Sequence, residues 1–311
     1  MEVKVLFNSS KKVSPTIGTI NIGKYTIEPL PDPSRPSNSA TTSYLLRFTD
    51  EMRAIDGGTS QPEMEARLFL SFLSLSLGSR ITVSSMMINS VNVPNPSPAP
   101  PYSHYWATVE HVHEFTALFS KVSECDAELA RQFLRACEVY QTAVTLVGEN
   151  NTLACFLFSI AIECLSNRYG RGSGHCAKFV DFILSYYPDC KELGDETDFK
   201  GLLKEIYYRH RSGFTHGGKP IPDAATLADR LGRVYVRNML DGKEIITPGL
   251  NWFEKVVRTT ITAFVLAQSS SAGDKKDRFK DISLEFGKVM LKAARNLAAH
   301  EIVSGSDFHL D

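Results

Sequence analysis

The sequence of 311 residues has almost no excess charge of either sign. Its 34 lysines and arginines are balanced by 35 acidic residues, which leaves a formal net charge of −1. A basic field over the whole molecule is therefore excluded, and any contact with a nucleic acid has to be local. No apolar run reaches the roughly 20 residues of a membrane-spanning helix, and residues 1–10 lack the apolar stretch of a signal peptide. We therefore expect a cytoplasmic chain with no membrane partner.

Cysteine is scarce too, and no two cysteines form a C-x-x-C pair. The sequence therefore lacks the usual motifs of structural zinc sites and of dithiol redox centres. Most of the cysteines lie in apolar segments with a helical pattern, so we expect buried free thiols in a reducing compartment. They are Cys125, Cys137, Cys155, Cys164, Cys176 and Cys190.

Signatures of phosphate loops and of metal sites are also missing. The glycine-rich segment 169–175 lacks the spacing and the lysine of a P-loop, and it follows a helical segment rather than a strand. His111 and His113 are two residues apart, so they do not share a helix face, and no third ligand follows at helical spacing. We therefore expect no metal site and no cofactor.

Short segments rich in β-branched residues dominate the first hundred residues. Glycine, proline and asparagine separate them, which is typical of strands joined by turns. One segment, 61–78, differs because it opens with Pro62 and acidic residues, becomes apolar and ends at Gly78, as a helix does. We therefore predict a smaller β-rich, α+β domain over residues 1–95. Its expected strands are 3–7, 16–22, 43–48 and 80–88.

The proline-rich run 93–103 indicates a boundary, because proline fixes φ and removes a hydrogen-bond donor. Almost everything after it has the apolar periodicity of helices. We therefore predict a mainly α chain, with a helical domain over residues 104–311 joined to the N-terminal domain by this run. Asp126 and Asp223 stand where helix N-caps are expected. The predicted helices are 109–122, 125–148, 151–168, 174–187, 197–211, 223–239, 250–269 and 276–300.

Glu163 interrupts the segment 153–165, which is apolar nearly all round and is therefore predicted to be a buried helix. An ionised carboxylate in such a helix is costly unless it is paired or hydrogen-bonded. Three explanations stay open, namely an exposed edge of the helix, a cap on a neighbouring backbone, or a partner arginine from another helix. Under the third explanation, we predict a buried or half-buried ion pair between Glu163 and Arg211.

The segment 204–220 is the most basic short stretch of this neutral chain, with a single acid, Glu205. Helical periodicity runs to about Arg211, and glycines then weaken or end the helix. Arginine offers a planar fork for phosphate oxygens, and histidine moves a proton near neutral pH. Arg211 and His216 therefore suit metal-independent RNA cleavage, in which a base takes the ribose 2′ proton and a cation stabilises the phosphate charge. A solvated helix end is the simpler interpretation of the same residues.

The spacing from Arg211 to His216 is R-x4-H, preceded by two tyrosines and followed by two glycines. This order resembles the motif of HEPN domains, in particular of the Apea-like branch, which has a tyrosine, then Arg-Ser, then His-Gly. The apolar helix around Glu163 resembles the family's earlier helix, and the segment around Arg258 resembles its closing amphipathic helix. The resemblance covers residues 125–268.

The resemblance implies a compact helical bundle, often a homodimer, and for many members a metal-independent endoribonuclease in antiviral defence or toxin–antitoxin systems. By position, Arg211 and His216 would be the catalytic pair, and Glu163 would be the acid that orients the arginine. An antitoxin, or a ligand sensed by the N-terminal domain, would be a further partner. The residues expected to bind RNA are Arg209, His210, Ser212 and Lys219.

Three alternatives stay open. Arg209 lies seven residues before His216 and shares a face with it on an uninterrupted helix, although the Arg-Ser pair favours Arg211. Arg295 and His300 repeat the R-x4-H spacing near the C-terminus, without the tyrosine before it and the glycines after it. Many HEPN-like domains perform no chemistry, so a module that only binds nucleic acid or a protein partner is the alternative function.

Overall fold

The structure is a computed structural model, and it describes residues 2–9, 12–13, 18–30, 43–49, 61–89, 91–93, 106–107, 109–188, 196–212, 233–237, 244–248, 250–268, 279–280 and 282–283. The strands are β1 (Glu2–Ser9), β2 (Lys12–Val13), β3 (Ile20–Ile22), β4 (Tyr25–Pro29), β5 (Ser43–Thr49), β6 (Ile81–Ile88), β7 (Val91–Val93), β8 (Trp106–Ala107), β9 (Arg233–Arg237) and β10 (Glu244–Pro248). The helices are α1 (Gln61–Leu77), α2 (Val109–Glu124), α3 (Ala127–Leu146), α4 (Asn151–Tyr169), α5 (His175–Tyr186), α6 (Glu196–Glu205), the π-helix η2 (Ile206–Ser212) and α8 (Leu250–Leu266).

One antiparallel sheet dominates the N-terminal region, with the strand order β3-β4-β5-β1-β6-β7. In β1 the residues Val3, Val5 and Phe7 are buried, and the residues between them are half-exposed. Because successive side chains of a strand point to opposite faces, one face of the sheet is covered and the other faces solvent. The chain must therefore supply a layer that packs on the buried face.

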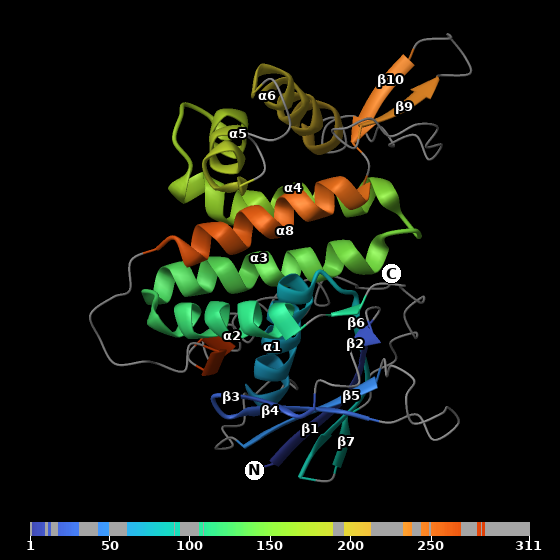
Figure 1. The fold of residues 1–311 in the computed structure, drawn as a ribbon, viewed down its shortest axis with the longest axis vertical. Helices are drawn as coiled ribbons and strands as arrows, with labels where there is room; N and C mark the ends of the chain where they lie inside the picture. The colour runs from blue at the N-terminus through green and yellow to red at the C-terminus, as the bar shows by residue number, and fades with distance from the viewer. Residues whose placement is uncertain are drawn as a thin grey trace, which may run out of the picture.

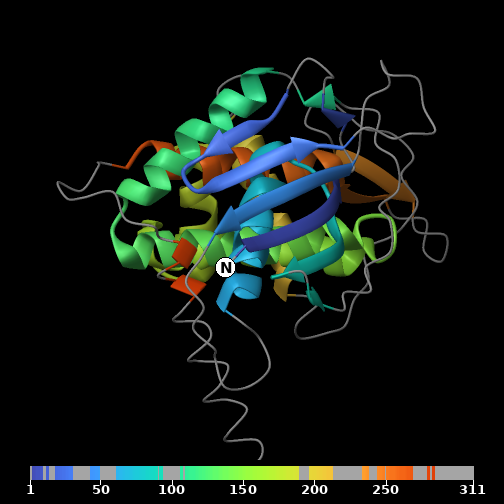
Figure 2. The ribbon, with the colours of Figure 1, turned by 90° about the horizontal axis from the view of Figure 1, so that it is seen from below.

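Helix α1 supplies that layer and lies between the sheet and the other helices (Figure 1). It has 14 buried residues out of 17, as expected of a helix that is covered on all sides. The helices α2 and α3 pack on α1, α4 and α8 pack with α3, and α5 and α6 follow on the far side. Seen from below, the sheet covers the helices behind it (Figure 2). Within the described residues, no helix combines the length and apolar character needed to cross a membrane.

The buried core runs without interruption from the sheet to the outer helices. Around α1 an aromatic cluster brings together Tyr25 of the sheet, Phe119 of α2 and Phe279 from the segment after α8. The rings of Phe119 and Phe279 stack with centroids 5.3 Å apart. Both sides of the proline-rich run therefore contribute to the core next to the sheet. The division into domains 1–95 and 104–311 stays a prediction.

Most predicted elements are present in the described residues, so the mainly α fold with an α+β N-terminal region is confirmed. The helices predicted between residues 109 and 211 correspond to α2, α3, α4, α5, α6 and η2, and the helix 250–269 corresponds to α8. Asp126 is the expected N-cap, because its carboxylate accepts hydrogen bonds from the backbone N–H groups of Glu128 and Leu129. The short strands β2, β4, β7, β8 and β10 are absent from the prediction, and of the predicted strand 16–22 the described residues form a strand only over β3. The predicted strands and helix that are confirmed at the N-terminal end are 3–7, 43–48, 80–88 and 61–78.

The predicted helix 223–239 is wrong over residues 233–237, which form β9 and pair with β10 in an antiparallel ladder. Valine and tyrosine dominate this segment, and such residues favour a strand once a second strand is there to pair with them. The rest of that predicted helix, including Asp223, lies outside the described residues. The same holds for most of the predicted helix 276–300.

The cysteines within the described residues are free thiols. Burial raises the pKa of the Cys155 thiol to about 12, so it stays protonated. Two further thiols are partly exposed, and Cys190 lies outside the described residues. The three that are buried as predicted are Cys125, Cys137 and Cys155.

Gly78 follows α1 and should resist substitution. Its φ of +57° lies in the left-handed region, and a Cβ there would lie 2.5 Å from Arg258 Nε. Gly148 also has a positive φ, of +86°, but nothing lies within 4 Å of its Cβ position. We expect alanine to lower the free energy of unfolding by about 2 kcal/mol at Gly78 and by about 1 kcal/mol at Gly148. Equal losses in urea denaturation would show that Arg258 moves aside without cost.

Candidate functional site

Glu163 lies in the middle of α4, which packs against α3, α5, α8 and η2. Only 5% of its surface is exposed, although the other buried side chains of the helix are apolar or small and neutral. The alternative that Glu163 occupies an exposed edge is therefore wrong. A carboxylate at this depth needs a partner, because burial without one costs several kcal/mol.

Arg211 is that partner. From η2 its Nε lies 2.8 Å from Glu163 Oε1, and its Nη2 lies 3.0 Å from Glu163 Oε2. Two parallel hydrogen bonds of this kind hold the guanidinium in one plane and one direction. The hydrogen bonds to Glu163 raise the pKa of Arg211, so its guanidinium stays positively charged. The predicted ion pair is confirmed, and a catalytic role for either residue stays a prediction.

The two members of the pair differ in their access to solvent. The Glu163 side chain is 6% exposed, whereas the Arg211 side chain is 25% exposed. The acid is thus part of the core, and the arginine stands at its border. An anion in solvent can therefore approach Arg211 without displacing Glu163.

The segment that carries Arg211 is a π-helix, which continues directly from α6. π-helical turns are rare and are frequent at functional sites. In η2 the guanidinium carbon of Arg211 lies 5.8 Å from the centre of the Tyr207 ring, so both side chains occupy one side of the turn. The sequence pattern predicts an α-helix up to Arg211, and nothing in it indicates the wider turn.

Tyr207 is one of the two tyrosines of the motif, but the sequence interpretation gave it no role in the site. Its side chain is buried and lies against Arg211. Burial, the nearby Glu163 charge and hydrogen bonding to Glu163 raise the pKa of Tyr207 to about 12. The phenol therefore stays protonated near neutral pH and keeps a proton to donate to the Glu163 carboxylate. Its position four residues before Arg211 was the available signal.

Tyr207→Phe should remove this hydrogen bond and lower the free energy of unfolding by about 1.5–3 kcal/mol, because the acceptor is charged. The folded pKa of Tyr207 lies above its unfolded value of about 10. The protonated Tyr207 therefore stabilises the fold fully below pH ~10. This stabilisation is lost as the pH rises through about 12. Urea denaturation of both proteins should show a difference at neutral pH that shrinks at alkaline pH.

Tyr208→Phe is the matched control, because the Tyr208 side chain is exposed. We expect it to have little effect on stability. A Tyr207→Phe effect that equals the control, or that does not depend on pH, would contradict a hydrogen bond between Tyr207 and Glu163.

The other predicted site residues cannot be placed beside this pair, because their side chains lie outside the described residues. For three of them the backbone belongs to η2, and these are Arg209, His210 and Ser212. Those that lie wholly outside the described residues are His216, Lys219, Arg295 and His300. The structure thus brings together Glu163, Arg211 and Tyr207.

Arg258, the arginine of the closing helix, has a different environment. Its Nε lies 2.9 Å from Glu254 Oε1 on the same helix, and Glu254 also accepts a hydrogen bond from the Tyr140 hydroxyl. Among the described contacts, none joins Arg258 to Glu163 or Arg211. The bond of Arg258 thus stays within α8, and Glu254 connects α8 to α3 through Tyr140.

An open groove of about 430 Å³ lies between α3 and α4 and extends to Glu163. Arg135 lines it from α3, and Cys164, Asn167 and Arg168 line it from α4. Burial raises the pKa of the Cys164 thiol to about 11, so this wall of the groove carries no thiolate. The groove therefore combines arginines with a buried acid that Arg211 already binds.

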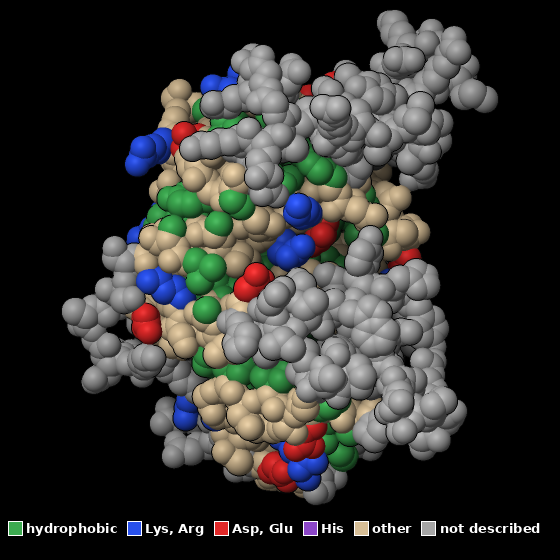
Figure 3. Space-filling model, viewed as in Figure 1, with side chains coloured by type: hydrophobic (Ala, Val, Ile, Leu, Met, Phe, Trp, Pro, Cys, Tyr) green, Lys and Arg blue, Asp and Glu red, His purple; other side chains and the backbone are tan. Residues whose placement is uncertain are grey.

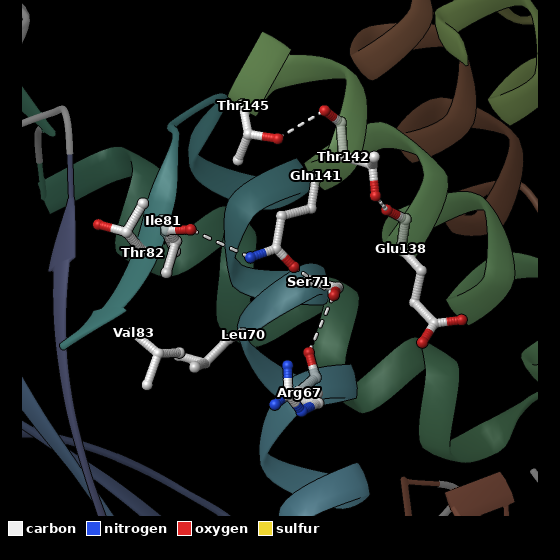
Figure 4. A pocket seen from close by; sticks show the side chains of 10 residues that line it. All are labelled: Arg67, Leu70, Ser71, Ile81, Thr82, Val83, Glu138, Gln141, Thr142 and Thr145. Atoms are coloured by element: carbon white, nitrogen blue, oxygen red, sulfur yellow. Dashed lines mark hydrogen bonds between the residues drawn. The ribbon is translucent and has the colours of Figure 1, made fainter. Parts of the chain in front are cut away.

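A second pocket, of about 290 Å³, lies between α1, β6 and α3 (Figure 4). Gln141 of α3 occupies its centre, where its amide donates to the Ile81 carbonyl at 3.1 Å and its carbonyl accepts from the Ser71 hydroxyl. Arg67 lines this pocket and pairs with Glu63 at 2.9 Å. The central amide is thus used to join α1, β6 and α3.

The distribution of charged side chains and of possible metal ligands can be compared with the position of this pair and groove. On the face shown in Figure 3, the described basic and acidic side chains are intermixed, in agreement with the net charge of −1. Among the described residues, no group of three or more histidine, cysteine or acidic side chains could hold a metal ion. The Glu163–Arg211 pair and the adjoining groove are the candidate site, because a buried acid there fixes a guanidinium and lines a groove that carries two further arginines.

Comparisons with protein-family models, with curated proteins and with solved structures found no match for this chain. The functional interpretation therefore depends on the geometry of the site and on the sequence motif.

Proposed function

We propose that the chain is a metal-independent endoribonuclease of the HEPN type, in which Arg211 and His216 act on RNA and Glu163 orients the arginine. The observation that carries this proposal is the bidentate bond of Glu163 to Arg211. A buried carboxylate fixes the direction of the guanidinium, and the exposed quarter of the arginine side chain gives access to a phosphodiester. The motif resemblance expects a glutamate from an earlier helix beside the arginine, and this geometry supports it.

Cleavage would begin when His216 takes the proton from a ribose 2′-hydroxyl, so that the 2′-oxygen attacks the adjacent phosphorus. The P–O2′ bond forms and the P–O5′ bond breaks, which leaves a 2′,3′-cyclic phosphate and a 5′-oxygen that takes up a proton. Arg211 would stabilise the negative charge that grows on the phosphate oxygens. The RNA strand would be held by four neighbouring residues of the motif, Arg209, His210, Ser212 and Lys219.

The proposed assembly is a homodimer. One Arg211–His216 pair offers a base and a phosphate clamp, but protonation of the leaving 5′-oxygen needs an acid as well. A second His216 across a two-fold axis would supply it, and two-fold dimers are the commonest closed assembly. RNA and a second copy of the chain are thus the proposed partners, with an antitoxin or a ligand of the N-terminal region as a third. Antiviral defence or a toxin system in the cytoplasm is the setting that the resemblance implies.

The second candidate function is a non-catalytic module that binds nucleic acid or a protein partner. The observation that favours it is that Nε and Nη2 of Arg211 are both bonded to Glu163. An arginine fixed in this way serves to bind a phosphate as well as to stabilise a transition state.

Expression of the wild type beside His216→Ala and His300→Ala in cells separates these functions. We expect the wild type to fragment total RNA and His216→Ala to leave it intact. His300→Ala, which alters the same R-x4-H spacing near the C-terminus, should behave like the wild type. Intact RNA in all three cultures at equal protein levels would favour the binding module. Activity lost only in His300→Ala would move the site to Arg295 and His300.

A further inference from the structure

The groove between α3 and α4 carries arginines from both helices. Arg135 is exposed, and among the described residues no hydrogen bond or ion pair engages its guanidinium. Arg168 lies on the opposite wall with 57% of its side chain exposed, 3.0 Å from Glu128 Oε1. Glu128 also binds Arg131, so one carboxylate is shared between two arginines. Both arginines of the groove thus have an acidic neighbour, Glu138 for Arg135 and Glu128 for Arg168, but both side chains remain exposed at the groove.

The acidic residue that lines the groove is already paired. Glu163 is the acidic residue among its described lining residues, and both of its oxygens are bonded to Arg211. The Cys164 thiol is protonated, because burial raises its pKa to about 11. At the other end Val139 and Ile160 present apolar surface. A chain of phosphates and sugars needs this combination of guanidinium groups and apolar contacts.

We propose that this groove binds the sugar-phosphate backbone of the RNA strand, with Arg135 and Arg168 on phosphates next to the one that reaches Arg211. The proposal rests on the proposed function for its substrate class, RNA. Glu163 connects the two places, because it lines the groove and bonds to Arg211. A strand held by the two arginines would thus be led to the candidate catalytic arginine. These two side chains position the substrate and take no part in the chemistry.

Binding of a single-stranded 2′-O-methyl RNA to the full chain tests the groove, because this probe lacks the 2′-hydroxyl and is not cleaved. Fluorescence anisotropy would compare the wild type with Arg135→Gln/Arg168→Gln. We expect roughly tenfold weaker binding, and a slope of log affinity against log salt that falls by ~1.4, or ~0.7 for each lost phosphate contact. Arg67→Gln, in the second pocket (Figure 4), is the matched control and should bind within about twofold of the wild type.

The outcomes separate this proposal from the proposed function. Weaker binding and a lower salt slope in the double variant, without RNA cleavage by the wild type, would support the groove and refute the nuclease. Cleavage by the wild type with an unchanged KM in the double variant would refute the groove alone. Equal losses in Arg67→Gln, or no RNA binding by the wild type, would also overturn the groove. Unchanged circular dichroism and melting midpoints would show that the variants are folded. As a further check on the role of charge, the single variant Arg135→Lys should retain most of the RNA binding that the single variant Arg135→Gln loses.

Discussion

Replacing Arg211 by alanine should lower the free energy of unfolding by about 3–5 kcal/mol. The substitution leaves the Glu163 carboxylate, with 6% of its side chain exposed, without its bidentate partner. Glu163→Ala should cost less, because the Arg211 that it strands is 25% exposed and can turn towards water. Urea denaturation of both single variants and of the double variant would measure the two costs and their coupling.

The double variant is expected to be more stable than the sum of the single losses predicts, because neither charge is then left alone. The exposed pair Arg67–Glu63 offers a matched control, since its arginine is 46% exposed. Pairs of that kind contribute about 0–1 kcal/mol. If Arg211→Ala costs no more than Arg67→Ala, the pair with Glu163 does not anchor η2 to α4.

The Glu163–Arg211 pair could be predicted because its signal is local and its energetic reason is strong. A charged residue in an apolar helix needs a partner of opposite charge. Within the motif, the basic segment around Arg211 is the part that contains such a partner. Tyr207 could not be predicted in the same way. Tyrosine is common in buried helices, so its presence alone does not indicate a site. Its approach to Glu163 depends on the π-helical turn, which no sequence pattern indicates.

Tertiary packing explains the other differences between sequence and structure. The segment 233–237 forms a strand because β10 is there to pair with it, and that pairing is not visible within the segment itself. Phe279 packs with Tyr25 although 253 residues separate them, so the composition around either residue gives no sign of their contact. The arginine groove likewise appears only when α3 and α4 are side by side.

Purified protein should cut single-stranded RNA in the presence of EDTA and leave 2′,3′-cyclic phosphate ends, if His216 is the base and Arg211 the phosphate clamp. His216→Ala should lower the cleavage rate by roughly 10²–10⁴-fold, the usual contribution of a general base, and leave the melting midpoint unchanged. Arg211→Lys keeps the charge but loses the planar fork, so it should retain RNA binding better than Arg211→Ala and still cleave slowly. Cleavage that stops with EDTA, or that persists in His216→Ala, would refute this mechanism.

Mixing the wild type with His216→Ala tests whether the second histidine comes from a partner subunit. If one His216 acts as the base and the other as the acid, a mixed dimer lacks one of the two groups and should be nearly inactive. After subunit exchange at equal concentrations, activity should fall to about a quarter of that of the same total amount of wild type, because only dimers with two wild-type chains remain complete. A fall to about half would mean that each subunit acts alone. In that case the acid has to come from the same chain, and His210 in η2 is the neighbouring residue to test.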